Sequence, residues 1–203
     1  MKCEVIRSED RPIRAYSMER RTKETQVSVN LCLEGGTVKV STGLGFFDHM
    51  LNALAFYAGF GLELEAKGDL EVDGHHTVED VGIVLGQALN QALGSRKGIR
   101  RFASAYIPMD EALCFVALDF SNRPFLVFDG EMPQPMIGAY DACLTREFMR
   151  ALAMNSGLTL HMKCLYGSNA HHMTEALFKA LGVAMKEAVR VEGDAVTSTK
   201  GVL

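Results

Sequence analysis

GHHTVED, from Gly74 to Asp80, and AHHMTEA, from Ala170 to Ala176, are two copies of one pattern around which the chain is organised. Each copy has two adjacent histidines, a glutamate three residues after the second, and a following run with helical spacing of apolar residues. Residues four apart on a helix share a face, so each copy can offer one metal ion an imidazole and a carboxylate. The residues in question are His75 with Glu79 and His171 with Glu175.

The second histidine of each copy, His76 or His172, points about 100° away around the helix axis and cannot easily serve the same ion. A lone His-x-x-x-Glu pair is usually a solvated pair worth about 0.2–0.5 kcal/mol. Two copies with identical spacing, about 100 residues apart, are typical of a duplicated unit. The pattern therefore favours two metal ions, each with ligands from both copies.

Composition indicates an ordinary globular protein. The 203 residues are 48% hydrophobic and 23% charged, and the net charge of −4 does not favour nucleic acid or a membrane as a partner. Neither a signal peptide nor a membrane-spanning run is evident. The cysteines are scattered, without a C-x-x-C pair, so we expect reduced, mostly buried thiols in a cytoplasmic protein. They are Cys3, Cys32, Cys114, Cys143 and Cys164.

Apolar periodicity predicts the order strand, strand, helix, strand, helix in both halves, with one further strand in the second half. In the first half we expect strands at 27–33, 37–41 and 62–72 and helices at 46–58 and 75–93. In the second half we expect strands at 101–107, 112–120, 125–128 and 158–166 and helices at 141–155 and 170–191. Thr77 and Asp80 resemble a capping box at the start of the first His-His helix.

These elements predict an α+β fold with sheet and helices in two layers. The fold contains an internal duplication of a half of about 100 residues. Residues 1–95 form the half carrying HHTVE and residues 96–203 the half carrying HHMTE, and together they make one compact unit.

The two remaining histidines are His49, on the helix 46–58, and His161, on the strand 158–166. Taken alone, each is more often a satisfied, partly buried side chain than a ligand. With the two motifs, however, six histidines and two glutamates divide evenly into two sites of three imidazoles and one carboxylate. Such ligands suit manganese, iron or zinc, and the residues alone do not choose among these metals.

Several polar residues are candidates for binding a phosphate dianion. Cationic side chains that converge on one pocket suit such an anion, although each alone is more often a surface charge. The candidates are Arg101, Arg123, Lys179, Ser198 and Lys200.

Five stretches occur in the order FFDHML, DGHHTVEDVGIVLGQAL, PMDEAL, GSNAHHMTEALFKALG and STKGVL. From about Glu24 to the C terminus, the chain closely resembles the imidazoleglycerol-phosphate dehydratase family, in its monofunctional form. The resemblance implies a manganese-dependent hydro-lyase of histidine biosynthesis with a ribosomal protein S5 domain 2-like fold. It also implies a 24-subunit homo-oligomer with active sites between subunits. The implied reaction converts D-erythro-imidazoleglycerol phosphate to imidazoleacetol phosphate and water.

The resemblance also implies roles for particular residues. One Mn²⁺ is assigned to His75, Glu79, His161 and His172, and the second to His49, His76, His171 and Glu175. The phosphate contacts fall on Arg101, Arg123, Lys179, Ser198 and Lys200, and Glu24 and Asp110 lie near the glycerol arm. The sequence departs from the family pattern at Asn122, usually glycine, at Thr197, usually proline, and at Ala142-Cys143, where Thr-Glu is common.

The implied chemistry explains why two ions are needed. The hydrogen at C2 of the glycerol arm is not acidic, because no carbonyl lies beside it. Metals on both imidazole nitrogens can stabilise an imidazolate that expels the neighbouring hydroxyl, after which loss of the C2 proton restores aromaticity. Glu175 is the predicted base, and Glu24 or a metal-bound water is the candidate acid.

Two other functions stay open at this point. A dinuclear metallohydrolase also uses histidine and carboxylate ligands, and would cleave an amide or phosphoester. A non-catalytic, metal-binding shell protein would hold metal without lyase activity.

Overall fold

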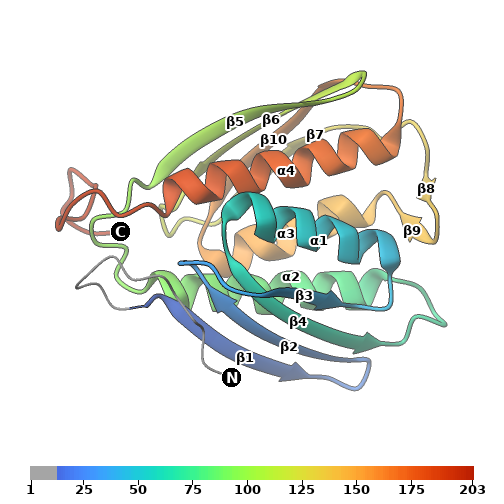
Figure 1. Cartoon of the computed structure of the whole chain (residues 1–203), viewed down its shortest axis with the longest axis horizontal. Coiled ribbons are helices and arrows are strands. Elements are labelled where there is room, and N and C mark those ends of the chain that lie inside the picture. Colours follow the sequence, from blue (N-terminus) through green and yellow to red (C-terminus); the bar gives the residue numbers. More distant parts are fainter. Residues whose placement is uncertain (1–12) are drawn as a thin grey trace.

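The structure is a computed structural model that describes residues 13–203, and it consists of two halves stacked with their helices facing each other (Figure 1). The first half contains β1 (Ala15–Arg21), β2 (Thr25–Cys32), β3 (Val38–Ser41), α1 (Gly45–Ala58), β4 (Gly61–Gly68) and α2 (His75–Leu93). The second contains β5 (Phe102–Met109), β6 (Ala112–Asp119), β7 (Phe125–Asp129), β8 (Met136–Ile137), β9 (Tyr140–Asp141), α3 (Leu144–Ser156), β10 (Thr159–Tyr166) and α4 (Ala170–Ala188).

The two main sheets have the same topology. Their strand orders are β1-β2-β4-β3 and β5-β6-β10-β7, so each strand of the first half has a counterpart in the second. In both sheets the final pair, β3 with β4 or β7 with β10, is parallel and the other pairs are antiparallel. The predicted α+β fold with a duplicated half is therefore confirmed.

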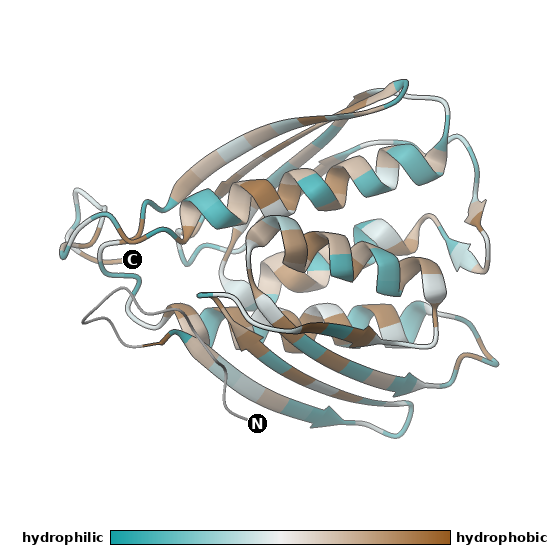
Figure 2. Cartoon of the chain, in the orientation of Figure 1, coloured by the Kyte–Doolittle hydropathy of each residue, from teal (hydrophilic) through white to brown (hydrophobic). Residues whose placement is uncertain are grey.

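Alternating burial explains why each sheet has an inner and an outer face. In β2, Val27, Val29 and Leu31 are at most 3% exposed and point toward the helices. Successive strand residues point to opposite faces, so Ser28 and Asn30 lie outside. Figure 2 shows hydrophobic and hydrophilic bands alternating along the strands, as expected for sheets with one buried face. Each half has two layers as predicted, but the whole chain places all four long helices between its sheets.

Strand boundaries in the first half differ from the prediction in two places. β1 was not predicted, because as an edge strand it has polar residues along much of its length, with only Met18 packed against the core. β4 ends at Gly68, so Leu70 and Val72 lie in the turn that follows rather than in a strand. A side chain at Gly68 would collide with Thr77, so the end of β4 lies against the start of α2.

The predicted capping box at Thr77 and Asp80 is wrong. The Thr77 hydroxyl is buried with no hydrogen-bond partner among the described residues, and Asp80 binds Thr25 and Arg20 instead. The Asp73 carboxylate accepts the His75 N–H at 2.7 Å, and in the second half the Asn169 side chain accepts the His171 N–H at 2.9 Å. In both halves the side chain two residues before the first histidine thus accepts that histidine's backbone N–H, but only Asn169 occupies the N-cap position, because the N-cap of α2 is Gly74.

The halves are joined by close helix pairs, α1 with α4 and α2 with α3. A Cβ atom at Gly182 of α4 would lie 2.7 Å from the Leu54 carbonyl oxygen and 3.1 Å from the Ala58 backbone nitrogen of α1. At Gly86 of α2, a Cβ atom would lie 2.8 Å from the Leu152 carbonyl oxygen of α3. Glycine at both positions lets the helix backbones come into contact, so the two halves pack closely together.

Two general expectations concern the environment of the chain. No helix among residues 13–203 is both long and apolar enough to span a bilayer. Cys32 and Cys114 are buried as predicted, whereas Cys164 is half-buried and Cys143 is exposed. Cys3 lies outside the described residues.

We expect Gly182→Ala to destabilise the fold even though alanine is the better helix former. Its methyl group meets backbone atoms, and overpacking costs about 1–3 kcal/mol against about 1 kcal/mol gained in helix propensity. Urea unfolding should therefore show a net loss of about 1 kcal/mol. Gly45→Ala is the matched control, because nothing lies within 4 Å of a Cβ atom there. Stabilisation by both substitutions would show that backbone contact at Gly182 is unimportant.

Candidate metal and phosphate sites

Three of the predicted metal ligands meet in one chain. Nε2 of His49 lies 3.3 Å, and Nε2 of His171 3.2 Å, from Oε2 of Glu175. One donor atom from each residue falls within 4.8 Å of the others. His49 comes from the first turns of α1 and the other two from the first turns of α4, so this cluster, which we call the central cluster, joins the two halves.

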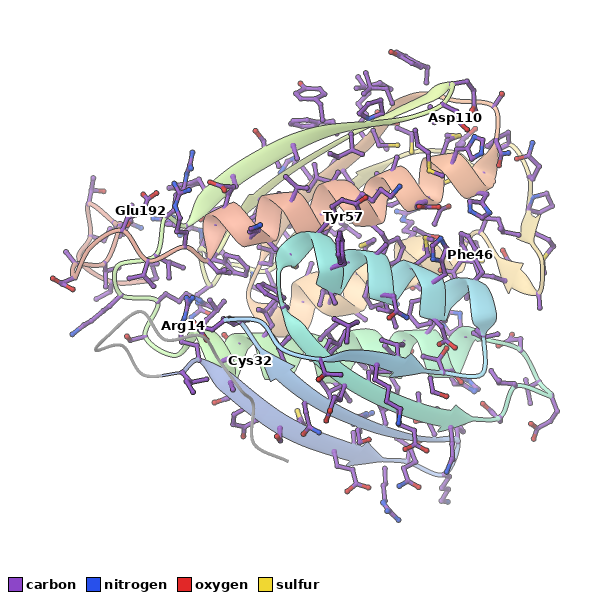
Figure 3. The ribbon with its side chains drawn as sticks, viewed as in Figure 1. Arg14, Cys32, Phe46, Tyr57, Asp110 and Glu192 are labelled. Atoms are coloured by element: carbon purple, nitrogen blue, oxygen red, sulfur yellow. The ribbon has the colours of Figure 1, made fainter. Side chains whose placement is uncertain are left out.

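Aromatic rings and a lysine surround the central cluster. The Phe46 ring stands edge-on to the His171 ring at 4.9 Å and contacts Tyr140 at 5.3 Å. Lys179 Nζ donates to Glu175 Oε1 at 2.8 Å and lies 5.7 Å from the Tyr57 ring centre. Figure 3 shows Phe46 and Tyr57 on α1, with Tyr57 pointing toward α4.

Glu175 is a buried carboxylate, only 7% exposed. Burial raises its pKa, but the hydrogen bond and charge of Lys179, followed by His49, lower it more, so the pKa lies below its ordinary value. Glu175 is therefore ionised near neutral pH and can act as a ligand or a base.

The second histidine of each motif lies against carboxylates of its own half. Nδ1 of His76 is 3.0 Å from Asp69 and 3.9 Å from Glu24, which sits in the β1–β2 turn. Hydrogen bonding to Asp69 raises the pKa of His76.

His172 has a similar setting. Its Nδ1 is 2.7 Å from Glu111 and its Nε2 is 3.6 Å from Asp110, both in the β5–β6 turn, where Figure 3 labels Asp110. Hydrogen bonding to Glu111 raises the pKa of His172, and with backbone hydrogen bonds the same contact lowers the pKa of Glu111 to about 2. The predicted acidic residues Glu24 and Asp110 thus occupy corresponding hairpin turns, each beside a second histidine.

The other predicted ligands are not gathered in one chain. Glu79 faces Arg150 of α3 at 3.4 Å, and among residues 13–203 no second cluster of three metal-binding side chains forms around it or around His75. His161 is exposed on the outer face of its sheet, since its neighbours Leu160 and Met162 are buried toward the helices. A single chain therefore holds only part of either proposed ligand set.

The predicted phosphate residues fall into two groups. Lys179 lies beside the central cluster, where it is paired with Glu175. Arg101 lies at the other end of α4, where its backbone N–H donates to the Ala188 carbonyl. Its guanidinium binds Asp119 twice, at 2.7 and 3.1 Å, and donates to the Thr197 carbonyl at 2.6 Å. This contact brings the segment containing Ser198 and Lys200 near Arg101.

Arg123 differs from Arg101 in its exposure. Its side chain is 68% exposed and reaches Asp119 only at 3.9 Å, whereas Arg101 is 10% exposed and already paired. Arg123 is therefore the freer cation of the two, and Arg101 is as much an anchor for the C-terminal segment as a candidate anion contact.

The two departures from the family pattern beside these residues fit their positions. Asn122 has a φ of 57°, in the left-handed region that asparagine tolerates better than most residues. Thr197 donates its hydroxyl to the Ile99 carbonyl at 3.0 Å. Asparagine thus accepts a backbone conformation that glycine also accepts, and the threonine hydroxyl ties the C-terminal segment to the main fold.

Sequence reasoning did not identify Asp69, Glu111 or Phe46 as part of the sites. Glu111 carried a signal, because it follows Asp110 in the quoted stretch PMDEAL. Phe46 likewise lies in the quoted stretch FFDHML, whereas Asp69 lies in none of the quoted stretches and its contact with His76 depends on tertiary packing.

The chain is similar to known proteins that share one family name. A model of the imidazoleglycerol-phosphate dehydratase family matches residues 42–185. The imidazoleglycerol-phosphate dehydratases of Acetivibrio thermocellus and Bacillus cereus are each 54% identical to the chain, over 193 and 194 residues. The alignments cover 94% of this chain and 99% or 100% of the relatives.

Solved structures of enzymes with this name are also similar. The imidazoleglycerol-phosphate dehydratase of Staphylococcus aureus has a TM-score of 0.81 at 37% identity, covering 87% of this chain and 99% of its own. The Pyrococcus furiosus enzyme, in complex with (S)-C348, has a TM-score of 0.81 at 41% identity. That match covers 92% of this chain and all of the other.

We expect Lys179→Met to weaken Mn²⁺ binding most at acidic pH. Without the lysine, burial dominates and the pKa of Glu175 rises, so protons compete with the metal at higher pH. The pH at which Mn²⁺ binding is half lost, measured by titration, should move upward. Lys186→Met makes the same charge change on an exposed part of α4 and should leave this pH unchanged. Equal behaviour of the two variants would contradict the electrostatic role of Lys179.

Proposed function

Because this chain belongs to the imidazoleglycerol-phosphate dehydratase family of hydro-lyases, we propose a specific reaction and cofactor for it. The enzyme removes water from D-erythro-imidazoleglycerol phosphate to give imidazoleacetol phosphate, in a reaction that depends on two Mn²⁺ ions per active site. The observation that carries this proposal is the central cluster, where two imidazoles and an ionised, buried carboxylate converge.

The donor set of the central cluster fits manganese. His49, His171 and Glu175 provide only nitrogen and oxygen atoms, and three protein ligands leave positions open on an octahedral ion. The thiols of Cys114 and Cys164 lie against each other on β6 and β10, away from this cluster. We assign His76 as the fourth ligand of this ion and keep His75, Glu79, His161 and His172 for the second.

Residues of this chain perform the proton transfers in the proposed mechanism. When bound, the ions stabilise negative charge on the substrate's imidazole ring while the neighbouring hydroxyl departs. Glu175 accepts the proton from C2, a role that its ionised state and its position beside two histidines support. Glu24, 56% exposed and beside His76, supplies the proton to the leaving hydroxyl.

The substrate's phosphate would be held by cations at a distance from the reacting carbon. Arg123 is exposed and only weakly paired, and the segment with Ser198 and Lys200 lies near it through Arg101 and Asp119. Because Arg101 lies at the other end of α4 from the central cluster, we propose that these cations serve the metal site of a neighbouring subunit. Binding the phosphate there fixes the glycerol arm beside the metals and turns remote binding energy into orientation. In this arrangement Asp110, which lies beside His172, would face the glycerol arm of the substrate.

We further propose that the active sites form between subunits of a large homo-oligomer, a 24-subunit shell. Several ligands that one site requires lie apart in one chain, most clearly His161 on the outer face of its sheet. That face exposes apolar side chains around His161, and patches of this kind mark interaction surfaces. They are Phe102, Tyr106, Phe125, Val127, Leu165 and Tyr166. The outer face of the first sheet carries Glu63, Glu65 and Lys67 instead.

A cytoplasmic location is part of the same proposal. Cys114, Cys143 and Cys164 are thiols in the structure, as expected in a reducing compartment.

We expect Glu175→Gln to retain metal and lose turnover. The amide oxygen can still ligate, but the side chain cannot accept a proton, and loss of a general base costs about 10²–10⁴-fold in kcat. Imidazoleacetol phosphate should be assayed by its ultraviolet absorbance, and metal content by elemental analysis. Glu187→Gln, on the surface of the same helix, should keep wild-type kcat. Near-normal turnover of Glu175→Gln would refute the assignment.

Chelation should reduce both the size and the melting temperature of the assembly. Metal held between subunits stabilises the associated form by mass action. Light scattering and thermal unfolding measure these changes, and Mn²⁺, Zn²⁺ and Fe²⁺ added back separately should restore dehydratase activity best with Mn²⁺. If chelation leaves size and melting temperature unchanged, metal ligation between subunits is wrong. An assembly that holds metal but has no dehydratase activity would favour a metal-storing shell protein. Hydrolysis of a phosphoester would favour a metallohydrolase.

A further inference from the structure

We propose that Glu111 and Asp69 are positioning residues that hold His172 and His76 by Nδ1 and so present Nε2 of each ring to metal. This inference rests on the proposed metal ligation by the two second histidines. It adds two residues to which neither the motifs nor the comparisons give a role.

The contact between Glu111 and His172 is itself held firmly in place. Oε2 of Glu111 lies 2.7 Å from Nδ1 of His172. Oε1 accepts the backbone N–H groups of Ser168 at 3.0 Å and Asn169 at 2.8 Å, just before α4 begins. One oxygen of the carboxylate therefore accepts hydrogen bonds from the loop that leads into α4, and the other contacts the imidazole ring.

A carboxylate from a different place in the fold does the same for His76. Nδ1 of His76 lies 3.2 and 3.0 Å from the two oxygens of Asp69, which follows the end of β4. Glu111 lies instead in the β5–β6 turn. Since Asp69 and Glu111 are not equivalent positions of the duplicated halves, the shared feature is not a by-product of the duplication. The two contacts are separate instances of one arrangement.

The chemistry of imidazole gives these contacts a purpose. A neutral ring has one N–H and one lone pair, so a ring that donates Nδ1–H to a carboxylate keeps its lone pair on Nε2. Carboxylates in this position orient a ligating histidine and make it a better donor. His49 and His171 also turn Nε2 toward the central cluster, so all four rings would ligate through the same atom.

Stability is a weak alternative explanation. The side chains of Glu111 and His172 are 38% and 24% exposed, and partly exposed ion pairs contribute little to folding. Their geometry is better suited to fixing the direction of a ring than to holding the fold together.

Glu111→Gln and Asp69→Asn test the inference in the complete, assembled enzyme. Each substitution keeps the shape of the side chain but leaves one acceptor oxygen, so in Glu111→Gln a single amide oxygen would have to serve both the loop and the ring. Titration with Mn²⁺, followed by the electron paramagnetic resonance signal of the free ion, should show affinity weakened about 10–100-fold. Glu65→Gln removes one charge from an exposed ion pair with Lys67 and should leave affinity unchanged.

A second measurement separates positioning from a purely structural role. The metal-free melting temperature of Glu111→Gln should match that of wild type, and only the rise on adding Mn²⁺ should shrink. A crystal structure of the Mn²⁺-loaded enzyme should show Nε2 of His76 and His172 facing the ions. Three results would each overturn the inference. They are unchanged Mn²⁺ affinity in both variants, a loss of metal-free stability as large as the loss of Mn²⁺-induced stabilisation, and ligation of the metal through Nδ1. A wild-type enzyme that binds no Mn²⁺ would instead overturn the proposed function.

Discussion

The close packing of α1 on α4 is the constraint on which the site depends. Gly182 allows the α4 backbone to touch α1 near Leu54, and one to two turns earlier along both helices His49 meets Glu175. A bulkier residue at the contact would separate the helices and with them the ligands. The same packing stacks the two halves, so the interaction that builds the core also assembles the central cluster.

A buried carboxylate at this junction needs compensation, and the surrounding residues supply it. Glu175 receives a hydrogen bond from Lys179 one turn along its own helix and faces two histidines. Burying a charge without partners is costly, whereas a paired carboxylate stays ionised and available. Phe46 and Tyr140 close the apolar side and connect the site to the aromatic core through Phe47. The contacts that keep Glu175 ionised therefore also tie it to the core.

The two halves share a fold but use it differently. Each has a hairpin turn that carries an acidic residue to the second histidine of its motif, Glu24 to His76 and Asp110 to His172. Only the second half contributes its glutamate to the central cluster, because Glu79 faces Arg150. The sheets also differ, with an outer face that is apolar in the second half and polar in the first. The two halves thus share one framework but place their glutamates and their outer sheet faces in different surroundings.

The sequence by itself determined the α+β class and the duplicated order of elements, because these depend on local periodicity and on residue spacing. Its inventory of histidines needed no structure, and the resemblance of its motifs indicated the family. It failed where the outcome depends on contacts distant in the chain. The edge strand β1 has few buried residues to reveal it, and Asp80, expected in a capping box, instead binds Thr25 and Arg20, which lie 55 and 60 residues away. Only the tertiary structure joined His49 to Glu175 across 126 residues, brought Asp69 and Glu111 to Nδ1 of the second histidines and turned His161 outward. Spacing along one helix predicts which of its residues share a face. Which neighbouring element packs against that face is decided by the packing of the whole core.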